Sequence, residues 1–521
     1  MQYNTIIVGA GSAGAILAAR LTEDPSHTVL LIEAGPDYPD FDKMPDPVKY
    51  GYGYDRNIWA SAFGPNSLHS WNYTARSTAQ AEPMLVPRGK VVGGSSAVNA
   101  QIFLRGIPED FDEWAARGND RWSSQELLSY HRKIETDQDF SDDFHGNDGP
   151  IIARRWKRSE MTADQEAFYQ ACLSVGYADS PDQNHPDSTG VGPTPFNNPD
   201  GIRWSTALGY INPARHRLNL TLRANVHSLR VLIEDGRAVG VEVESGGEVF
   251  TLNGDEIILS AGAINSPQLL MLSGIGPADH LRDMDIPVIK DLPGVGKNLR
   301  DHPQVQLTWK TRDDFEQDPL APRIQLALRY TADDSPLRND MFIHPFGFAT
   351  ESGIYLLSDQ KPLGVGMIIA LYLAKGAGDI TLNSIDPHEQ PFLNYDYLKE
   401  EEDRRRFREA VHIAINLAQS DAYSKFIEHS VEPTDAALES DESLDQWLLE
   451  NVRTSHHVSG TAKMGPSSDE MAVVDQFGHV YGIDNLRVAD ASIMPDCIRA
   501  NTNVTSMVIG ERIADFIRAG E

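Results

Sequence analysis

A chain of 521 residues with 76 acidic and 45 basic side chains has a formal net charge of −31, which argues against nucleic acid and anionic membranes as partners. The length exceeds what one hydrophobic core usually serves, so two domains or one elaborated α/β domain are expected. The two cysteines, Cys172 and Cys497, lie far apart and form no C-x-x-C pair, which argues against a disulfide scaffold or a thiolate metal site.

The chain shows no targeting or membrane signal. Its start lacks the basic segment, apolar run and small-residue cleavage site of a secretory signal. The longest weakly polar run, residues 363–374, is too short to span a bilayer and is typical of a buried strand. The 16 histidines form no metal-ligand cluster in the sequence. We therefore expect a cytoplasmic protein with no bound metal, while the oligomeric state is left open.

The first 35 residues have the order of a dinucleotide-binding βαβ unit: strand, Gly9-x-Gly11-x-x-Gly14, helix, second strand, Glu33. In such a unit Gly9 permits the tight turn, Gly11 lets the backbone approach a pyrophosphate, and Gly14 lets the helix pack close to the strand. The phosphates then lie at the helix N-terminus. Glu33 is placed to accept hydrogen bonds from an adenosine ribose. The pattern does not separate FAD from NAD.

Three later stretches carry further signals. Residues 88–106 are rich in glycine and serine and then turn apolar. Residues 260–276 follow a strand and contain Ser266-Pro267, which predicts a helix start, and then an apolar face that ends at Gly274. Near the C-terminus, a strand leads through a proline-containing loop into an amphipathic helix predicted from about Asn503 to Ile517.

These stretches resemble the glucose-methanol-choline (GMC) flavoprotein oxidoreductases nearly from end to end. Residues 89–99 fit the first family signature, residues 262–276 fit the second, and residues 201–211 and 292–303 are also typical. The similarity is greatest to the branch of choline oxidases and dehydrogenases and of hydroxymethylfurfural-type oxidases. The resemblance implies FAD as the cofactor and an alcohol as the substrate, which is oxidised to an aldehyde or ketone.

The family fold implied is α/β, with a Rossmann-like FAD-binding domain assembled from residues 1–155, 212–305 and 457–521. An α+β substrate domain with an antiparallel sheet would comprise residues 156–211 and 306–456, and residues 35–73 resemble a lid over the FAD. The cofactor contacts implied are Gly9, Gly11, Ser12, Ala13, Gly14, Glu33, Ala34, Trp71, Gly94, Ser95, Ser96, Val98, Asn99, Ala100, Val226, Asp490, Ala491, Asn501, Thr502 and Asn503.

The stretch 455–465 contains two adjacent histidines. In an extended segment neighbouring side chains point to opposite faces, so only one of His456 and His457 is expected to face a given site. The family pattern His-x-x-Gly-Thr matches His457, and the family's second active-site residue at the start of the last helix matches Asn503. His456 and Gln304 are expected in the substrate pocket.

The chemistry explains these residue types. Alcohol oxidation removes a hydroxyl proton and a carbon-bound hydride, and an imidazole can take the proton. An asparagine amide can hold the developing alkoxide, while flavin N5 accepts the hydride. The N-terminus of the last helix is placed to stabilise the negative charge of the reduced flavin. His457 is therefore the predicted base and Asn503 its predicted partner.

Three departures from relatives refine the prediction. Val98 stands where some members carry a histidine that tethers FAD, which predicts non-covalent FAD. Gln304 stands where choline-specific members carry a glutamate facing the trimethylammonium group, which disfavours choline. Ser455 is polar where some oxidases have an aliphatic residue, which favours a dehydrogenase with another electron acceptor over reaction with molecular oxygen, without deciding between them.

Three other classes of function remain to be weighed. The same scaffold supports non-redox members such as hydroxynitrile lyases and light-driven decarboxylases, and the His–Asn pair permits a lyase. A purely binding flavoprotein is disfavoured because both active-site positions carry competent residues. An NAD-dependent enzyme would leave the two later signatures unexplained.

Overall fold

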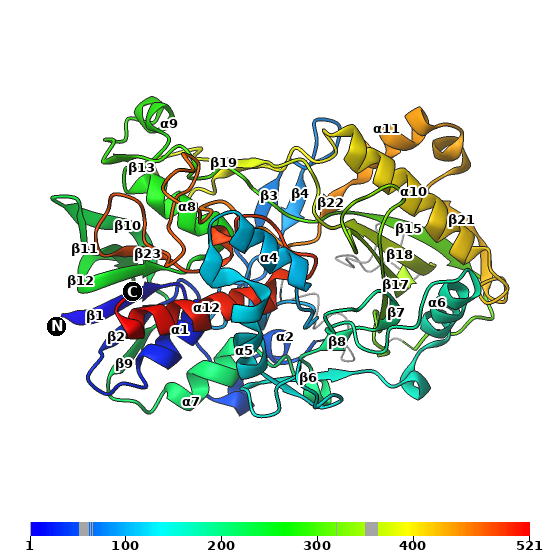
Figure 1. The fold of residues 1–521 in the computed structure, drawn as a ribbon, viewed down its shortest axis with the longest axis horizontal. Helices are drawn as coiled ribbons and strands as arrows, with labels where there is room; N and C mark the ends of the chain where they lie inside the picture. Colours follow the sequence, from blue (N-terminus) through cyan, green and yellow to red (C-terminus); the bar gives the residue numbers. More distant parts are fainter. Residues whose placement is uncertain (1, 52–61, 63, 65, 319, 350–362) are drawn as a thin grey trace.

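The structure is a computed structural model that describes residues 2–51, 62, 64, 66–318, 320–349 and 363–521. Within these ranges, two large sheets lie towards opposite ends of the long axis in Figure 1. No helix in the same ranges is long and apolar enough to cross a membrane.

The first sheet has a parallel core. Strand β1 (Tyr3–Val8) pairs with β2 (Val29–Ile32) and β12 (Glu248–Leu259), and the outer neighbours are β9 (Leu220–Arg223) and β23 (Leu486–Val488). Strands β1 and β2 and the end of β12 are apolar and mostly buried, as expected where both faces of a parallel sheet are covered. The first half of β12 instead pairs antiparallel with β11 (Arg237–Ser245), which pairs with β10 (His227–Glu234).

Helices from both ends of the chain pack beside this sheet. Helix α1 (Gly14–Leu21) lies beside α12 (Thr502–Ala519), and α8 (Gly262–Leu272) follows β12 (Figure 1). Glu511 of α12 is buried and accepts hydrogen bonds from Arg20 of α1 at 2.9 Å and from the Tyr210 hydroxyl at 2.9 Å. The hydrogen bond between Arg20 and Glu511 therefore holds the C-terminal helix against the first βαβ unit.

The second sheet is antiparallel. Its strands run in the order β21 (Ile427–Glu432), β15 (Pro303–Thr311), β18 (Gly364–Leu371), β17 (Met341–Ala349), β16 (Leu326–Tyr330) and β7 (Gly190–Pro193), with β22 (Arg453–Thr454) beside β15. Helices α6 (Ala163–Ser174), α10 (Glu401–Ala418) and α11 (Asp441–Asn451) lie around it (Figure 1). Every residue of β17 and β18 is buried.

This architecture confirms the predicted α/β class with a separate antiparallel sheet. The first sheet draws its strands from the segments predicted for the FAD-binding domain, whereas β15 begins at Pro303, inside the predicted 212–305 segment. The domain boundaries stay a prediction. Other elements are α2 (Asp46–Lys49), α4 (Pro108–Ala116), α5 (Ser124–Ile134), α7 (Asn212–Ala214), α9 (Ala278–Asp283), β3 (Tyr73–Ala75), β4 (Met84–Val86), β5 (Glu135–Asp137), β6 (Ile151–Arg155), β8 (Pro195–Phe196), β13 (Ile275–Gly276), β14 (Lys290–Asp291), β19 (Asp379–Thr381) and β20 (Phe392–Asn394).

The start of α8 differs from the prediction. The helix begins at Gly262, so Pro267 lies inside it rather than at its first turn. A proline there removes the hydrogen bond to the carbonyl four residues earlier. That carbonyl, of Ala263, accepts a hydrogen bond from the Thr461 hydroxyl at 2.6 Å, which compensates for the missing donor. The predicted last helix is confirmed, with α12 extending to Ala519.

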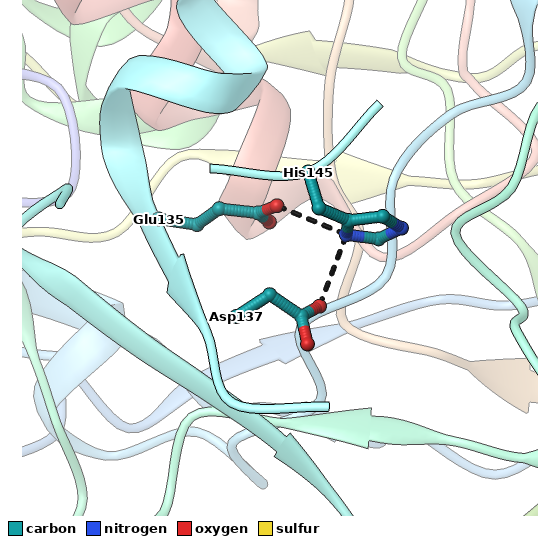
Figure 2. A group of neighbouring side chains, drawn as sticks. All are labelled: Glu135, Asp137 and His145. Atoms are coloured by element: carbon teal, nitrogen blue, oxygen red, sulfur yellow. Dashed lines mark hydrogen bonds and ion pairs between the residues drawn. The ribbon is translucent and has the colours of Figure 1, made fainter. Parts of the chain in front are cut away.

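A buried ionic cluster lies where β5 meets the loop that follows it. Figure 2 shows the carboxylates of Glu135 and Asp137 directed at one ring nitrogen of His145, Nδ1, at 3.1 and 3.0 Å. The other nitrogen, Nε2, lies 2.9 Å from the Asp182 carboxylate. Burial alone would lower the pKa of His145, but the hydrogen bonds to Asp137, Asp182 and Glu135 raise it to about 11. His145 is therefore an imidazolium at neutral pH.

Two arginines complete the charge balance of this cluster. Arg155 pairs with Asp137 at 2.8 Å and with Asp182 at 2.7 Å, and Arg105 pairs with Glu135. Three buried carboxylates thus face two guanidiniums and one imidazolium, and the partly exposed carboxylate of Asp139 lies 3.7 Å from Arg155. Glu135, Asp137 and His145 have the side-chain types of a metal site. Because the carboxylates are already neutralised, the set suits a protonated histidine better than a divalent ion.

Replacing His145 is expected to destabilise the fold in a pH-dependent way. His145→Gln leaves buried carboxylates short of one cation, which should lower the free energy of unfolding by about 3–5 kcal/mol. The folded-state pKa lies above the unfolded value of 6.5, so the loss is greatest below pH 6.5 and fades as pH rises towards 11. Melting temperatures of both proteins across pH 6–10 measure this, with the exposed His429→Gln as the control. A pH-independent gap would contradict the imidazolium assignment.

Candidate active site

A cavity runs between the two sheets and is lined by residues of both. Val8 and Ile32, at the carboxyl ends of β1 and β2, line one part of it. Gln304, His344 and Ala370, on neighbouring strands of the second sheet, line another part. Ligands of open parallel sheets bind at the carboxyl ends of the strands, so the cavity occupies the expected position.

Two glycine-rich turns meet at the cavity. A Cβ atom at Gly94, whose φ is +52°, would lie 2.6 Å from the Cα of Gly11. Only glycine therefore allows the turn after β1 and the loop at 88–106 to come this close. Their backbones form a narrow cradle beside the start of α1.

Glu33 lies directly after β2, beside this cradle. Its carboxylate accepts hydrogen bonds from the backbone N–H groups of Ala10 at 3.0 Å and Gly35 at 2.9 Å, and it lines the cavity. Burial raises the pKa of Glu33 to about 7, although these donors oppose the shift. The side chain is therefore fixed in position with further acceptor capacity towards the cavity.

Most of the predicted cofactor residues line this cavity. Two do not: Gly14, which lies behind the turn against Gly9, and Ser96, whose hydroxyl donates to the Gly93 carbonyl at 2.6 Å. The predicted residues that the structure brings together here are Gly9, Gly11, Ser12, Ala13, Glu33, Ala34, Trp71, Gly94, Ser95, Val98, Asn99, Ala100, Val226, Asp490, Ala491, Asn501, Thr502 and Asn503.

His457 lies at the other end of the cavity, between two partners. Its Nε2 is 2.9 Å from the side-chain amide nitrogen of Asn501. Its Nδ1 is 2.9 Å from Nδ1 of His302. The backbone N–H of His457 donates to the carboxylate of Asp301 at 2.9 Å, which fixes the main chain at this point.

The predicted pairing of His457 with Asn503 is absent from the structure, in which the side chain of Asn501 contacts His457 instead. Asn501, the N-cap of α12, reaches His457, whereas Asn503 accepts a hydrogen bond from the Ser12 hydroxyl at 2.7 Å. The reason is helical geometry: Asn503 is the second residue of the helix, two positions past the cap, and each position turns the side chain by about 100°. Asn503 thus faces the glycine turn, and Asn501 faces the histidine.

Both adjacent histidines line the cavity, so His456 lies where the pocket prediction placed it, whereas the expectation that only one of the two faces a given site does not hold. That expectation assumed an extended backbone, but His456 has a φ of +67°. The left-handed conformation breaks the alternation of side chains. Gln304 also lines the cavity, and its side-chain oxygen accepts a hydrogen bond from the Ser455 hydroxyl at 3.0 Å.

The imidazoles around this end of the cavity are neutral. Burial lowers the pKa of His457 well below its usual range. Burial also lowers the pKa of His456 to about 3, of His302 to about 3, and of His344 to about 4. A neutral imidazole has a free lone pair, so His457 can accept a proton at physiological pH.

Residues 3–304 and 374–510 match the GMC oxidoreductase family. The chain belongs to this family. It is 37% identical over 548 residues to the oxygen-dependent choline dehydrogenase of Klebsiella pneumoniae, covering 99% of this chain and 96% of that protein. It is 35% identical over 516 residues to a GMC-type oxidoreductase of Rhodococcus erythropolis, covering 99% and 98%. The solved structure of pyridoxine 4-oxidase from Mesorbium loti is similar with a TM-score of 0.90 and 29% identity, covering 99% of each chain.

As a GMC oxidoreductase, the chain is an FAD-dependent enzyme that oxidises an alcohol. Its residues fit this cofactor. The glycine cradle leaves space for a pyrophosphate, and Glu33 is placed to receive a ribose. Two buried polar atoms that line the cavity, Oδ1 of Asn501 and Nδ2 of Asn503, have no hydrogen-bond partner among the described residues. These atoms are available to a bound group.

The predicted lid is described only in part, because residues 52–61, 63 and 65 lie outside the described residues. In the described part, Trp71 lines the cavity, and the Lys90 ammonium lies 4.6 Å from the centre of a Trp71 ring. Trp71 also packs against Tyr73 and His227. The tryptophan therefore closes the dinucleotide end of the cavity on one side.

Sequence reasoning missed several cavity residues. His302 was seen only within a typical family stretch, without a role. His344, Ile368, Ala370 and Tyr372 of the second sheet were not assigned either, although all line the cavity. One signal was available, since His344 is an isolated imidazole within an otherwise apolar strand. The alternation of β18 puts Ile368, Ala370 and the next alternate residue, Tyr372, on one face.

Crowding the glycine cradle is expected to reduce FAD binding. Gly94→Ala forces the two turns apart, so purified protein should contain less FAD, measured as the ratio of visible to ultraviolet absorbance. Gly176→Ala is the control, because its φ of +98° is also positive while no described atom lies within 4 Å of the new Cβ. Equal FAD content in both variants would contradict the cradle.

Proposed function

We propose that this enzyme oxidises an uncharged alcohol with His457 as the base that removes the hydroxyl proton. The observation that carries the proposal is the contact between His457 and Asn501 in the cavity that the dinucleotide turn also lines. A neutral imidazole and an amide donor, side by side, are what proton removal from a weakly acidic alcohol requires.

The roles of the two side chains follow from their donors and acceptors. Nε2 of His457 takes the hydroxyl proton, and the Asn501 amide donates a hydrogen bond to the oxygen as negative charge develops on it. Bound FAD supplies the acceptor for the hydride of the carbinol carbon. Asn501 thus replaces Asn503 as the proposed partner of His457, and Asn503 is proposed to contact the cofactor.

An uncharged substrate is supported by the charges around the cavity. Among the described residues that line it, the only carboxylates are Glu33 and Asp490. Glu33 lies beside the glycine turn, and Asp490 accepts hydrogen bonds from the Gly262 backbone at 2.8 Å and the Ser266 hydroxyl at 2.6 Å. Neither carboxylate forms a hydrogen bond with His457 among the described residues, so a quaternary ammonium such as that of choline would lack a counter-charge there. Gln304 instead offers a neutral amide.

We also propose non-covalent FAD and an electron acceptor other than oxygen. Val98 lines the cavity and has no atom that could bond to the flavin, and residues 94–100 contain no histidine or cysteine. The polar Ser455, two residues before His457, supports a dehydrogenase. A reducing cytoplasmic location fits the two cysteines, Cys172 and Cys497, which are buried and unpaired.

Removal of the base is expected to slow reduction of the flavin by about 10²- to 10⁴-fold. FAD-loaded protein is mixed anaerobically with aryl, furanyl, aliphatic and sugar alcohols, and the visible flavin absorbance is followed for wild type and His457→Ala. His456→Ala is the neighbouring control, with a smaller loss expected. If His456→Ala abolishes reduction and His457→Ala does not, the base is misassigned. If no alcohol bleaches the wild type, the proposed substrate class fails.

A carboxylate at position 304 is expected to change the selectivity towards cations. Gln304→Glu should raise the ratio of kcat/KM for choline to that for a neutral alcohol by about tenfold, equivalent to ~1.4 kcal/mol. Gln304→Leu removes the amide without adding charge and serves as the control. If both variants change the activities towards choline and towards the neutral alcohol in the same proportion, the residue at position 304 does not determine the selectivity for substrate charge.

A further inference from the structure

The acceptor that faces the ring of His457 is a second histidine rather than a carboxylate. The two Nδ1 atoms are 2.9 Å apart, and the rings meet at 66° with their centres 4.9 Å apart. Asp301 is adjacent, but its oxygens accept from the backbone N–H groups of His457 and His302 and from the Thr454 and Tyr397 hydroxyls. Neither oxygen of the Asp301 carboxylate forms a hydrogen bond with either imidazole ring among the described residues.

The protonation of His302 is decided on its other side. Its Nε2 lies 2.7 Å from the carbonyl oxygen of Ile498, which can only accept a hydrogen bond, so Nε2 carries a hydrogen. The Cys497 sulfur lies 3.1 Å from the same nitrogen and is compatible with it as a weak acceptor. Burial in this position lowers the pKa of His302, so the ring is neutral and Nε2 holds its only ring proton. Nδ1 of His302 is then an acceptor.

The ring of His302 is also held in place. It stacks on Tyr372 with the ring centres 4.0 Å apart, and Tyr372 stacks on Phe342 at 5.0 Å. His302 has no exposed surface. A flip of the ring would place carbon atoms where the two nitrogens stand, and so would break the hydrogen bonds to both Ile498 and His457.

We propose that His302 is a positioning residue that fixes the tautomer of His457. Since Nδ1 of His302 accepts, Nδ1 of His457 donates, and the lone pair of His457 is on Nε2. That atom is the one that faces the Asn501 amide and the cavity. In the opposite tautomer, two lone pairs would lie 2.9 Å apart at the His302 contact. This inference rests on the proposed role of His457 as the base.

A neutral partner has a different electrostatic effect from a carboxylate. A carboxylate that accepts from a catalytic histidine also stabilises the imidazolium and so raises its pKa. His302 supplies the orientation without that charge. The other groups around His457 are the neutral His456 and His344 and the cationic Arg88, none of which stabilises an imidazolium. His457 therefore stays deprotonated, with its lone pair on Nε2, the atom that lies 2.9 Å from the Asn501 amide.

The test compares two replacements of His302 in the FAD-loaded full chain. His302→Asn retains an acceptor oxygen near the position of Nδ1, whereas His302→Leu retains none. The rate of flavin reduction at saturating alcohol is expected to fall about 100-fold or more in His302→Leu, as for a base held in the wrong tautomer, and to recover substantially in His302→Asn. The concentration of alcohol that half-saturates reduction should change little. Equal losses in both variants, or no loss in either, would overturn the proposal.

A second measurement determines the tautomer of His457 directly. In protein labelled with ¹⁵N-histidine, the resonances of His457 are identified by their loss in His457→Gln, and the ¹⁵N shifts show which nitrogen carries the hydrogen. Hydrogen on Nδ1 in wild type supports the proposal, and hydrogen on Nε2 overturns it, even where His302→Leu does not fold. Failure of the base assignment is distinguishable, because His457→Ala would then reduce its flavin normally whatever the tautomer.

Discussion

The buried carboxylate of Asp301 is the constraint on which the reactive end of this enzyme depends. One oxygen accepts from the backbone of both His302 and His457, and the other accepts from Thr454 and Tyr397. Four donors satisfy a carboxylate that would otherwise be costly to bury. The result is that a segment before β15 and a segment after β22, far apart in sequence, have a fixed separation. The contact between the two imidazoles exists because this separation is fixed.

The two ends of the cavity have different electrostatic environments. At the dinucleotide end, glycine turns, backbone N–H groups and the start of α1 offer positive dipole ends to an anionic group. At the other end, burial keeps four imidazoles neutral beside an amide and a hydroxyl. Hydrogen-bonding capacity without charge suits the removal of a proton from a neutral alcohol. His457 and Asn501 lie outside the strands, in segments held by the Asp301 carboxylate and by the start of α12.

The sequence was most informative where its signals are local. The turn at Gly9–Gly14 and the acid at Glu33 lie within one βαβ unit, so their arrangement follows from neighbouring residues. The site depends instead on details that spacing does not contain. Asn501 and Asn503 are equivalent in composition, and only the position of the helix cap decides which one meets His457. The φ of His456 and the start of α8 before Pro267 are set by tertiary contacts, such as that of Thr461 with Ala263. The role of His302 could not be predicted from the sequence, because its partner His457 lies more than a hundred residues away along the chain.

The interleaved order of the first sheet also matters while the protein is being made. Tyr3 pairs with Gly254, while residues 490–491 after β23 and the first turn of α12 line the cavity. The N-terminal βαβ unit thus emerges from the ribosome long before its neighbours, with β1 unpaired on the side that β12 will cover. A nascent chain has no complete site for FAD until the final helix appears. Enclosure of the cofactor is therefore a property of finished molecules, and translation that stops early yields chains unable to retain it.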